Sequence, residues 1–126
     1  MTDVIADSLT RIRNASILGK KETILIKTKF VGDVLKVLRD EEMIEDYEIG
    51  EKDIIVQLKY GIDDKPVITN LKKVSSPGQR IYISAKDIRP VMNGRGIGII
   101  STSKGVLSTA HAKHLGVGGE YICEVW

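Results

Sequence analysis

Two segments in the first half of the chain have hydrophobic residues at helical spacing. In residues 3–18, Ile5, Leu9 and Ile12 recur three or four positions apart and a glycine follows, which predicts an amphipathic helix. Residues 30–42 carry a second pattern of this kind, formed by Val31, Val34, Leu35 and Leu38. We expect this second helix to pack on a sheet.

Extended segments lie around these helices. The stretch "TILIK" at residues 23–27 predicts a short strand. In "YEIGEKDIIVQLKY", Ile54, Val56 and Leu58 alternate with their neighbours, and "GEKD" between two such runs predicts a hairpin turn. The first 62 residues therefore predict the order helix, strand, helix, strand, strand.

The stretch "GIDDKP" at residues 61–66 interrupts every periodicity in the chain. It predicts a boundary between an N-terminal lobe, residues 1–62, and a C-terminal lobe, residues 67–126. Directly after the boundary, residues 67–75 predict a strand, "SPG" a tight turn, and residues 80–84 the returning strand.

The rest of the second lobe is mostly extended. We expect a helical turn in "KDIRPV", a strand over "GIGIIST", a turn at "SKG", a short helix over "STAHAKHLG" ended by Gly116, and a strand over "GGEYICEVW". A period of two in the last strand places Tyr121, Cys123 and Val125 on one face. The whole pattern predicts an α+β protein, with a C-terminal lobe of mostly antiparallel β-structure and short helices.

The net charge of +2 hides three segments of different sign. Residues 8–39 contain eight Lys or Arg and two acids, a balance of +6, and residues 65–113 contain nine and one, a balance of +8. Residues 40–64 contain ten acids and two Lys, a balance of −8. Charge segregated in this way attracts polyanions to one side of a protein.

The composition excludes several classes of protein. No apolar run approaches the roughly 20 residues needed to span a bilayer, and the N-terminus lacks the pattern of a secretory signal, so we expect a cytoplasmic protein. The single cysteine, Cys123, cannot form an internal disulfide and is interpreted as a small buried hydrophobic residue.

The segment "NGRGIGIISTSKG" at residues 93–105 combines glycines, hydroxyl residues and a lysine, as phosphate-binding loops do. It does not match the Walker A motif, because Ser103 replaces the second glycine and Gly105 follows Lys104. It does not match the dinucleotide fingerprint either, because Ile99 stands where the third glycine belongs and a strand follows.

Other catalytic groups are equally incomplete. His111 and His114 lack further zinc ligands, and turn chemistry explains Asp63 and Asp64 in the inter-lobe stretch. No base is identified that could activate a serine of the 101–103 run. We therefore expect no active site, no metal, no cofactor and no small-molecule substrate.

The stretch "STSKG" suits an extended ligand that offers hydroxyls and phosphates. The hydroxyls of Ser101, Thr102 and Ser103 can donate and accept, Lys104 adds a positive charge, and Gly105 allows a close approach of the main chain. Tyr82 offers a flat face for stacking, with half-buried packing as the alternative. Two classes stay open here: a nucleic-acid-binding protein, and a phosphate-ligand or nucleotide-binding module.

Five ordered stretches resemble the bacterial small-ribosomal-subunit protein S8 family: "LTRIRNA", "VLKVLRDEEMIEDY", "KPVITNLKKVSSPGQRIY", "GIISTSKGV" and "LGVGGEYIC". The match extends from "DSLTRIRNA" at residues 7–15 to the C-terminal Trp126. The resemblance implies a two-lobe α+β protein that works in the ribosome. Its expected partners are a stem in the central domain of 16S rRNA, neighbouring small-subunit proteins and, in some members, the messenger RNA of its own operon.

The resemblance also implies which residues bind RNA. The principal contact is expected at the 101–105 loop, with Tyr82 as a contacting residue and Glu120 as an acid that orients the loop. Secondary contacts are expected in the N-terminal lobe, from Arg11, Arg13, Asn14, Thr28 and Lys29. Arg95 replaces a leucine common in the family, and we expect its charge to lie close to the loop.

Overall fold

The computed structural model describes residues 3–126 and divides into two compact units, one ending at Asn70 and the other beginning at Leu71. Helices and two antiparallel sheets occur in the described residues, which confirms the α+β prediction. The division into lobes of residues 1–62 and 67–126 stays a prediction about folding.

The N-terminal unit has the predicted order of elements. They are α1 (Val4–Ile17), β1 (Glu22–Ile26), α2 (Lys29–Asp40), β2 (Ile44–Ile49) and β3 (Asp53–Leu58). The three strands form an antiparallel sheet in the order β1-β3-β2, and residues 50–52 connect β2 to β3 as the hairpin turn. A short 3₁₀ turn, Ile62–Asp64, lies within the "GIDDKP" stretch.

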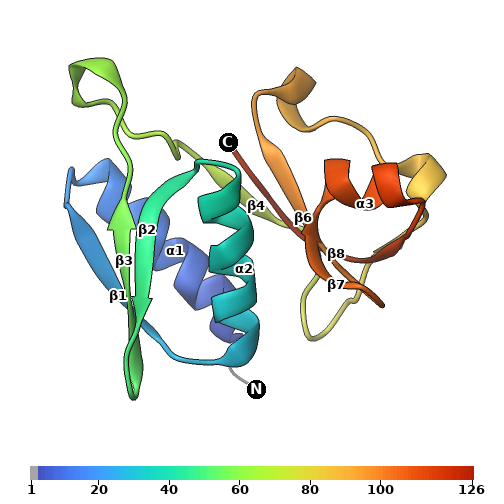
Figure 1. Ribbon diagram of the computed structural model, residues 1–126, viewed down its shortest axis with the longest axis horizontal. Coiled ribbons are helices and arrows are strands. Elements are labelled where there is room, and N and C mark those ends of the chain that lie inside the picture. The colour runs from blue at the N-terminus through green and yellow to red at the C-terminus, as the bar shows by residue number, and fades with distance from the viewer. Residues whose placement is uncertain (1–2) are drawn as a thin grey trace. The chain divides into compact units, whose positions relative to one another are not determined.

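Both N-terminal helices cover the same face of this sheet (Figure 1). Leu25, Ile54 and Val56, which point to the helices, are at most 1% exposed, and Leu58 on the same face is 7% exposed. Strand periodicity sends their neighbours to the opposite face, where Ile24 lies across from Ile55. One face of the sheet is therefore core, and the other is open.

The C-terminal unit contains β4 (Leu71–Lys73), β5 (Tyr82–Ile83), β6 (Ile97–Thr102), β7 (Gly105–Ser108), α3 (Thr109–Leu115) and β8 (Gly119–Val125). Four strands follow the order β4-β8-β6-β7, and β5 also pairs with β8. Two 3₁₀ turns, Ala85–Asp87 and Val91–Gly94, lie before β6. The helical turn expected in "KDIRPV" is present only in part, because Ala85–Asp87 ends at the second residue of that stretch and extended residues separate it from Val91–Gly94.

The predicted hairpin between residues 67–75 and 80–84 is also wrong. Strands β4 and β5 do not pair with each other, and each instead runs antiparallel to β8. The chain leaves the edge of β8 after Ser75, where the amides of Val74 and Ser75 both donate to the Ile122 carbonyl. It returns at Ile81, whose carbonyl accepts from Tyr121 N–H. The "SPG" turn itself is present in the loop between these two points.

The last strand carries a bulge that the period-two pattern did not predict. Ile99 pairs with Cys123, but Ile100 pairs with Tyr121, so Ile122 is an extra residue in β8. Consecutive residues of β6 face opposite sides, and Tyr121 therefore lies on the face opposite Cys123. The expected single face of Tyr121, Cys123 and Val125 is wrong for this reason.

One face of the C-terminal sheet packs against α3. Ile100, Ala112 and Ile88 form a buried cluster there, joined by Ile83, Leu107 and Val117. The helix begins where Ser108 accepts from His111 N–H and ends at Gly116, whose φ is +73°, as the sequence predicted. Ser101, which follows Ile100 in β6, faces the other side of the sheet.

Candidate nucleic-acid interface

Ser103 and Lys104 form the two-residue turn between β6 and β7. The Thr102 hydroxyl donates to the Gly105 carbonyl at 2.8 Å and accepts from Lys104 N–H at 3.0 Å, so this side chain holds the turn together. Gly105 has a φ of +105°, which residues with a Cβ rarely adopt. The Ser103 and Lys104 side chains are exposed at the tip, and neither has a hydrogen-bond partner among residues 3–126.

A row of side chains crosses the sheet beside this turn. Tyr82 on β5 lies opposite Glu120 on β8, and Glu120 lies opposite Ser101 on β6. Directly opposed residues of antiparallel strands share a face, with Cβ atoms about 5 Å apart. The polar row, Tyr82–Glu120–Ser101, therefore ends next to Thr102, and the fold gathers the predicted C-terminal residues on one surface.

Tyr82 is the most exposed aromatic residue of this surface, with 71% of its area accessible. The alternative of half-buried packing is therefore wrong. Only two residues of β5 pair with β8, so the ring stands on a short edge strand. An exposed ring fixed on a sheet can stack on a base or a sugar.

The Glu120 carboxylate is held by donors that precede β5. The Ser75 hydroxyl donates to it at 2.6 Å and the Arg80 guanidinium at 3.1 Å. The Ser75 hydroxyl in turn accepts from Ile81 N–H, and Ser75 is only 3% exposed. Glu120 thus orients the segment that leads to Tyr82, whereas the sequence had suggested that it orients the 101–105 loop.

Sequence reasoning missed three residues of this network: Lys73, Ser75 and Arg80. Ser75 and Glu120 are 45 positions apart, and no spacing rule connects them. The only available signal was the excess of basic residues in the 65–113 segment. Burial, together with the nearby Arg80 charge, lowers the pKa of Lys73, which indicates that positive charges crowd around this one carboxylate.

Three of the N-terminal candidates lie on α1. Arg11 is exposed and forms an ion pair with Asp7 at 3.1 Å, one helical turn away. Asn14 is exposed one turn further on, and Arg13 is partly buried. Exposed ion pairs of this kind contribute little free energy to stability. Breaking the pair so that Arg11 could contact a phosphate would therefore cost little free energy.

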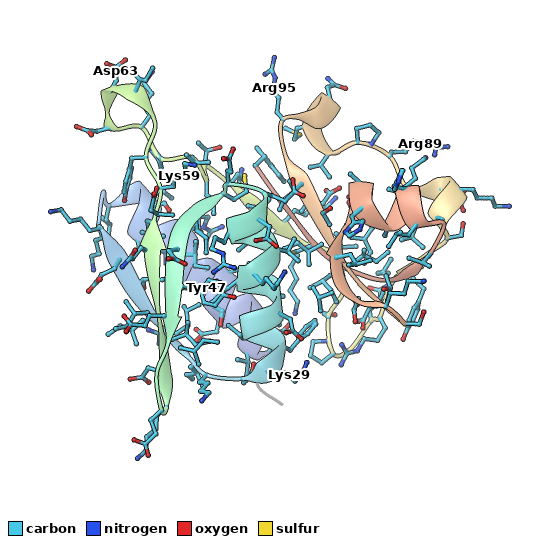
Figure 2. All side chains as sticks on the ribbon, viewed as in Figure 1. Lys29, Tyr47, Lys59, Asp63, Arg89 and Arg95 are labelled. Atoms are coloured by element: carbon cyan, nitrogen blue, oxygen red, sulfur yellow. The ribbon has the colours of Figure 1, made fainter. Side chains whose placement is uncertain are left out.

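The other two candidates lie at the start of α2 (Figure 2). The Thr28 hydroxyl accepts from Val31 N–H at 3.1 Å and caps the helix, and Lys29 is the first helical residue. Both line a surface pocket of about 330 Å³ to which Lys27 and Lys36 also contribute. The sequence did not identify these two lysines, which the turn of the chain into α2 brings beside Lys29.

Arg95 does not lie near the 103–104 turn. It precedes β6, whereas the turn follows the last residue of that strand (Figure 2). The six residues of β6 separate the two by roughly 20 Å of extended chain. The expectation that Arg95 returns a charge to the loop is wrong, because the intervening sequence is a strand.

Within residues 3–126, no group of three His, Cys, Asp or Glu is placed to hold a metal ion. Across the same residues, no helix is long and apolar enough to cross a membrane. His111 and His114 are exposed on α3. Cys123 is fully buried, as predicted, and burial raises the pKa of its thiol to about 12.

The fold and the surface define an α+β protein with a hydroxyl-rich, positively charged turn beside an exposed aromatic ring. Comparison with known proteins identifies the family. A family model described as ribosomal protein S8 matches residues 3–126, so the chain belongs to the ribosomal protein S8 family.

Close relatives share the whole length of the chain. "Small ribosomal subunit protein uS8c" of Gracilaria tenuistipitata var. liui is 47% identical over 131 residues, which cover 100% of this chain and 99% of that protein. The uS8 protein of Clostridioides difficile (strain 630) is 47% identical, with 100% and 98% covered. The uS8 protein of Thermus thermophilus is 45% identical, with 100% and 99% covered. The resemblance found in the sequence is confirmed.

Proposed function

We propose that this chain is a structural constituent of the small ribosomal subunit and that it binds a stem in the central domain of 16S rRNA directly. Relatives over its full length carry the name of small-subunit proteins. In this role the chain helps to assemble the platform of the subunit and performs no catalysis.

The observation that carries the proposal is the polar row with its adjoining turn. Ser101, Ser103 and Lys104 present hydroxyls and a charge, while Thr102 and Gly105 fix the backbone that carries them. Folded RNA is recognised through its shape, its 2′-hydroxyls and its phosphates, and a rigid edge with groups of these kinds is complementary to it. Tyr82 adds a stacking surface at the other end of the row.

The N-terminal unit supplies secondary contacts in this proposal. Thr28 and Lys29 line a pocket with Lys27, Lys36 and Asp33. Lys29 pairs with Asp33, and the three lysines still outnumber the single acid, which favours a phosphate group. The exposed polar side chains of α1, Arg11 and Asn14, with Arg13 beside them, form the second group of contacts.

Three further parts of the proposal follow from a ribosomal role. The protein works in the cytoplasm as part of the ribosome and has other small-subunit proteins as neighbours. It also represses translation of its own operon if a messenger RNA reproduces the shape of the ribosomal stem. None of these requires a membrane or a small-molecule substrate.

The alternative of a nucleotide-binding module is not favoured by the geometry of the turn. Phosphate loops direct several free backbone N–H groups and a helix N-terminus at one ligand. Here the Lys104 amide is already bonded to Thr102, and a strand follows the turn where a phosphate loop would have a helix. The exposed side chains point outward from a hairpin and do not surround a small molecule.

Footprinting tests the proposal directly. The purified chain is added to a transcript of the 16S central domain, and we expect it to protect one stem from chemical modification. Affinity should fall steeply as salt rises, because several phosphate contacts release counterions. Tight binding of ATP with shallow salt dependence, and no protected stem, would falsify the proposal in favour of the nucleotide-binding module.

A further inference from the structure

The open face of the N-terminal sheet carries an unusual combination of side chains. The cross-strand register places Ile24 opposite Ile55 and Ile55 opposite Glu48, and it places Ile26 opposite Asp53. Because residues two apart in a strand share a face, the three isoleucines adjoin one another. We call this surface, Ile24, Ile26 and Ile55 with the surrounding acids Glu22, Glu48, Glu51 and Asp53, the isoleucine face.

Two of the three isoleucines are largely accessible to solvent. Ile24 is 53% exposed and Ile26 is 56% exposed, and Ile55 between them is partly buried. Single exposed apolar residues need no explanation, but adjoining ones mark an interaction surface more often. Burial against a partner would remove this apolar area from water, which is the main driving force of association.

The acids around the isoleucines have no ion-pair partner among the described residues. Glu22, Glu48, Glu51 and Asp53 form no ion pair among residues 3–126, whereas the acids of α2 pair with lysines four positions away. A surface pocket of about 410 Å³ lies in this face and is lined by Ile24, Glu48, Gly50, Glu51, Lys52, Asp53 and Ile55. The pocket thus has an apolar floor and an acidic rim with one lysine.

We propose that the isoleucine face binds a basic polypeptide segment of another protein, in which Lys or Arg side chains alternate with apolar ones. The apolar side chains lie on Ile24 and Ile55, and the cations pair with the carboxylates of the rim. A face built in this way discriminates through charge as well as through apolar contact. The proposal goes beyond RNA binding, because it assigns a protein partner to a surface outside the RNA contacts.

Charge excludes the two simplest other occupants. An RNA backbone would meet the unpaired carboxylates of Glu48, Glu51 and Asp53 and would be repelled. A second copy of the chain, docked through the same face, would bring the two acidic rims together. Only a partner that carries positive charge and apolar side chains together satisfies both features of the face.

Methyl spectroscopy of the full-length chain tests the proposal with a defined probe. The chain is labelled at isoleucine δ1 methyls and titrated with a short peptide in which lysine and valine alternate. We expect the signals of Ile24, Ile26 and Ile55 to shift, while those of the buried Ile99 and Ile100 do not. A peptide with glutamine in place of valine should bind at least tenfold more weakly. If the two peptides bind equally, binding depends on charge alone and the isoleucines take no part, which would overturn the proposal.

Charge reversal supplies the matched variants. The double change Glu48→Lys and Glu51→Lys should lower the affinity for the lysine-valine peptide at least tenfold. Glu41→Lys, an exposed acid after α2 and away from the face, should leave its affinity within about twofold. Thermal unfolding of each variant shows whether the fold is kept. Equal losses in the double variant and in Glu41→Lys would contradict a localised site.

Two further measurements separate the other occupants. If the 16S central-domain transcript shifts the methyl signals of Ile24 and Ile55, the face contacts RNA and the proposal is wrong. If sedimentation shows a dimer that Ile24→Thr dissolves, the partner is a second copy. Lys104→Ala should leave the affinity for the peptide unchanged, so that failure here and failure of RNA binding are distinguishable.

Discussion

Each unit of the chain presents one sheet face with a cross-strand row of side chains that no helix of that unit covers, and the two rows differ in how they treat negative charge. In the C-terminal row, Glu120 accepts from Ser75 and Arg80, and its charge is neutralised within the protein. In the N-terminal row, Ile24–Ile55–Glu48, no cation among residues 3–126 pairs with Glu48. The same architecture therefore suits a polyanion in one unit and a basic protein segment in the other.

The comparison shows that local pairing decides the function of a carboxylate more than its presence does. A paired carboxylate in a basic environment positions neighbouring groups and leaves a nearby phosphate undisturbed. An unpaired carboxylate repels phosphate and attracts cations. The charge of a segment indicates whether its surface as a whole attracts or repels phosphate. The contacts of each acid decide whether that particular carboxylate does so.

The largest expected effect comes from Gly119→Ala, which should damage the C-terminal face and spare the N-terminal one. A Cβ at this position would lie 2.0 Å from the Ser101 carbonyl oxygen, so the pairing of β8 with β6 must shift. We expect a loss of roughly 3 kcal/mol in the free energy of unfolding, measured with denaturant, and weaker RNA binding.

Gly78→Ala is the matched control for this change. Gly78 lies in the "SPG" turn with open space around it and without a positive φ. It should alter the free energy of unfolding by less than about 0.5 kcal/mol. If Gly119→Ala and Gly78→Ala have the same free energy of unfolding, the close approach of β8 to β6 does not constrain the polar row.

Lys104→Ala should weaken RNA binding by roughly 1.5–3 kcal/mol if the lysine donates a charged hydrogen bond to a phosphate. The slope of log affinity against log salt should also fall by about one. Lys86→Ala removes another exposed charge from the same unit, outside the row, and should change neither quantity much. A slope that stays the same in Lys104→Ala would remove this residue from the interface.

Tyr82→Ala should cost roughly 1–3 kcal/mol in RNA binding, because an exposed ring that stacks on a base or sugar is lost. Tyr82→Phe keeps the ring and should bind within a few tenths of a kcal/mol of the parent. Because the ring is 71% exposed, neither change should lower the free energy of unfolding much. Equal losses of affinity in the two variants would assign the contact to the hydroxyl group.

Thr102→Val should have the smallest effect, about 1 kcal/mol on stability. The hydroxyl that bridges Lys104 N–H and the Gly105 carbonyl is lost while the shape of the side chain is kept. We expect faster amide hydrogen exchange at Lys104 and a moderate loss of RNA affinity. Ser103→Ala leaves this bridge intact. It should lower the affinity for a cognate stem more than the affinity for a random duplex. Unchanged exchange in Thr102→Val would show that the turn does not depend on the bridge.

Much of the fold could be predicted because its signals are local. The amphipathic spacing of α1 and α2, the turn between β2 and β3, and the glycine that ends α3 each depend on a few neighbouring residues. The predictions failed where distant residues compete for the same backbone groups. The bulge at Ile122 and the shared edge of β8 are two such places.

The sequence alone determined the α+β class, the order of the N-terminal elements, the buried state of Cys123 and the family to which the chain belongs. Tertiary structure decided that Ser75 and Arg80 hold Glu120, that Tyr82 stands exposed in one cross-strand row with Glu120 and Ser101, and that three isoleucines adjoin on an open, acidic face. The physical reason is that helical and turn preferences act over a few residues. Cross-strand neighbours, in contrast, are set by register between segments far apart in the chain, and register is fixed only when the whole sheet packs.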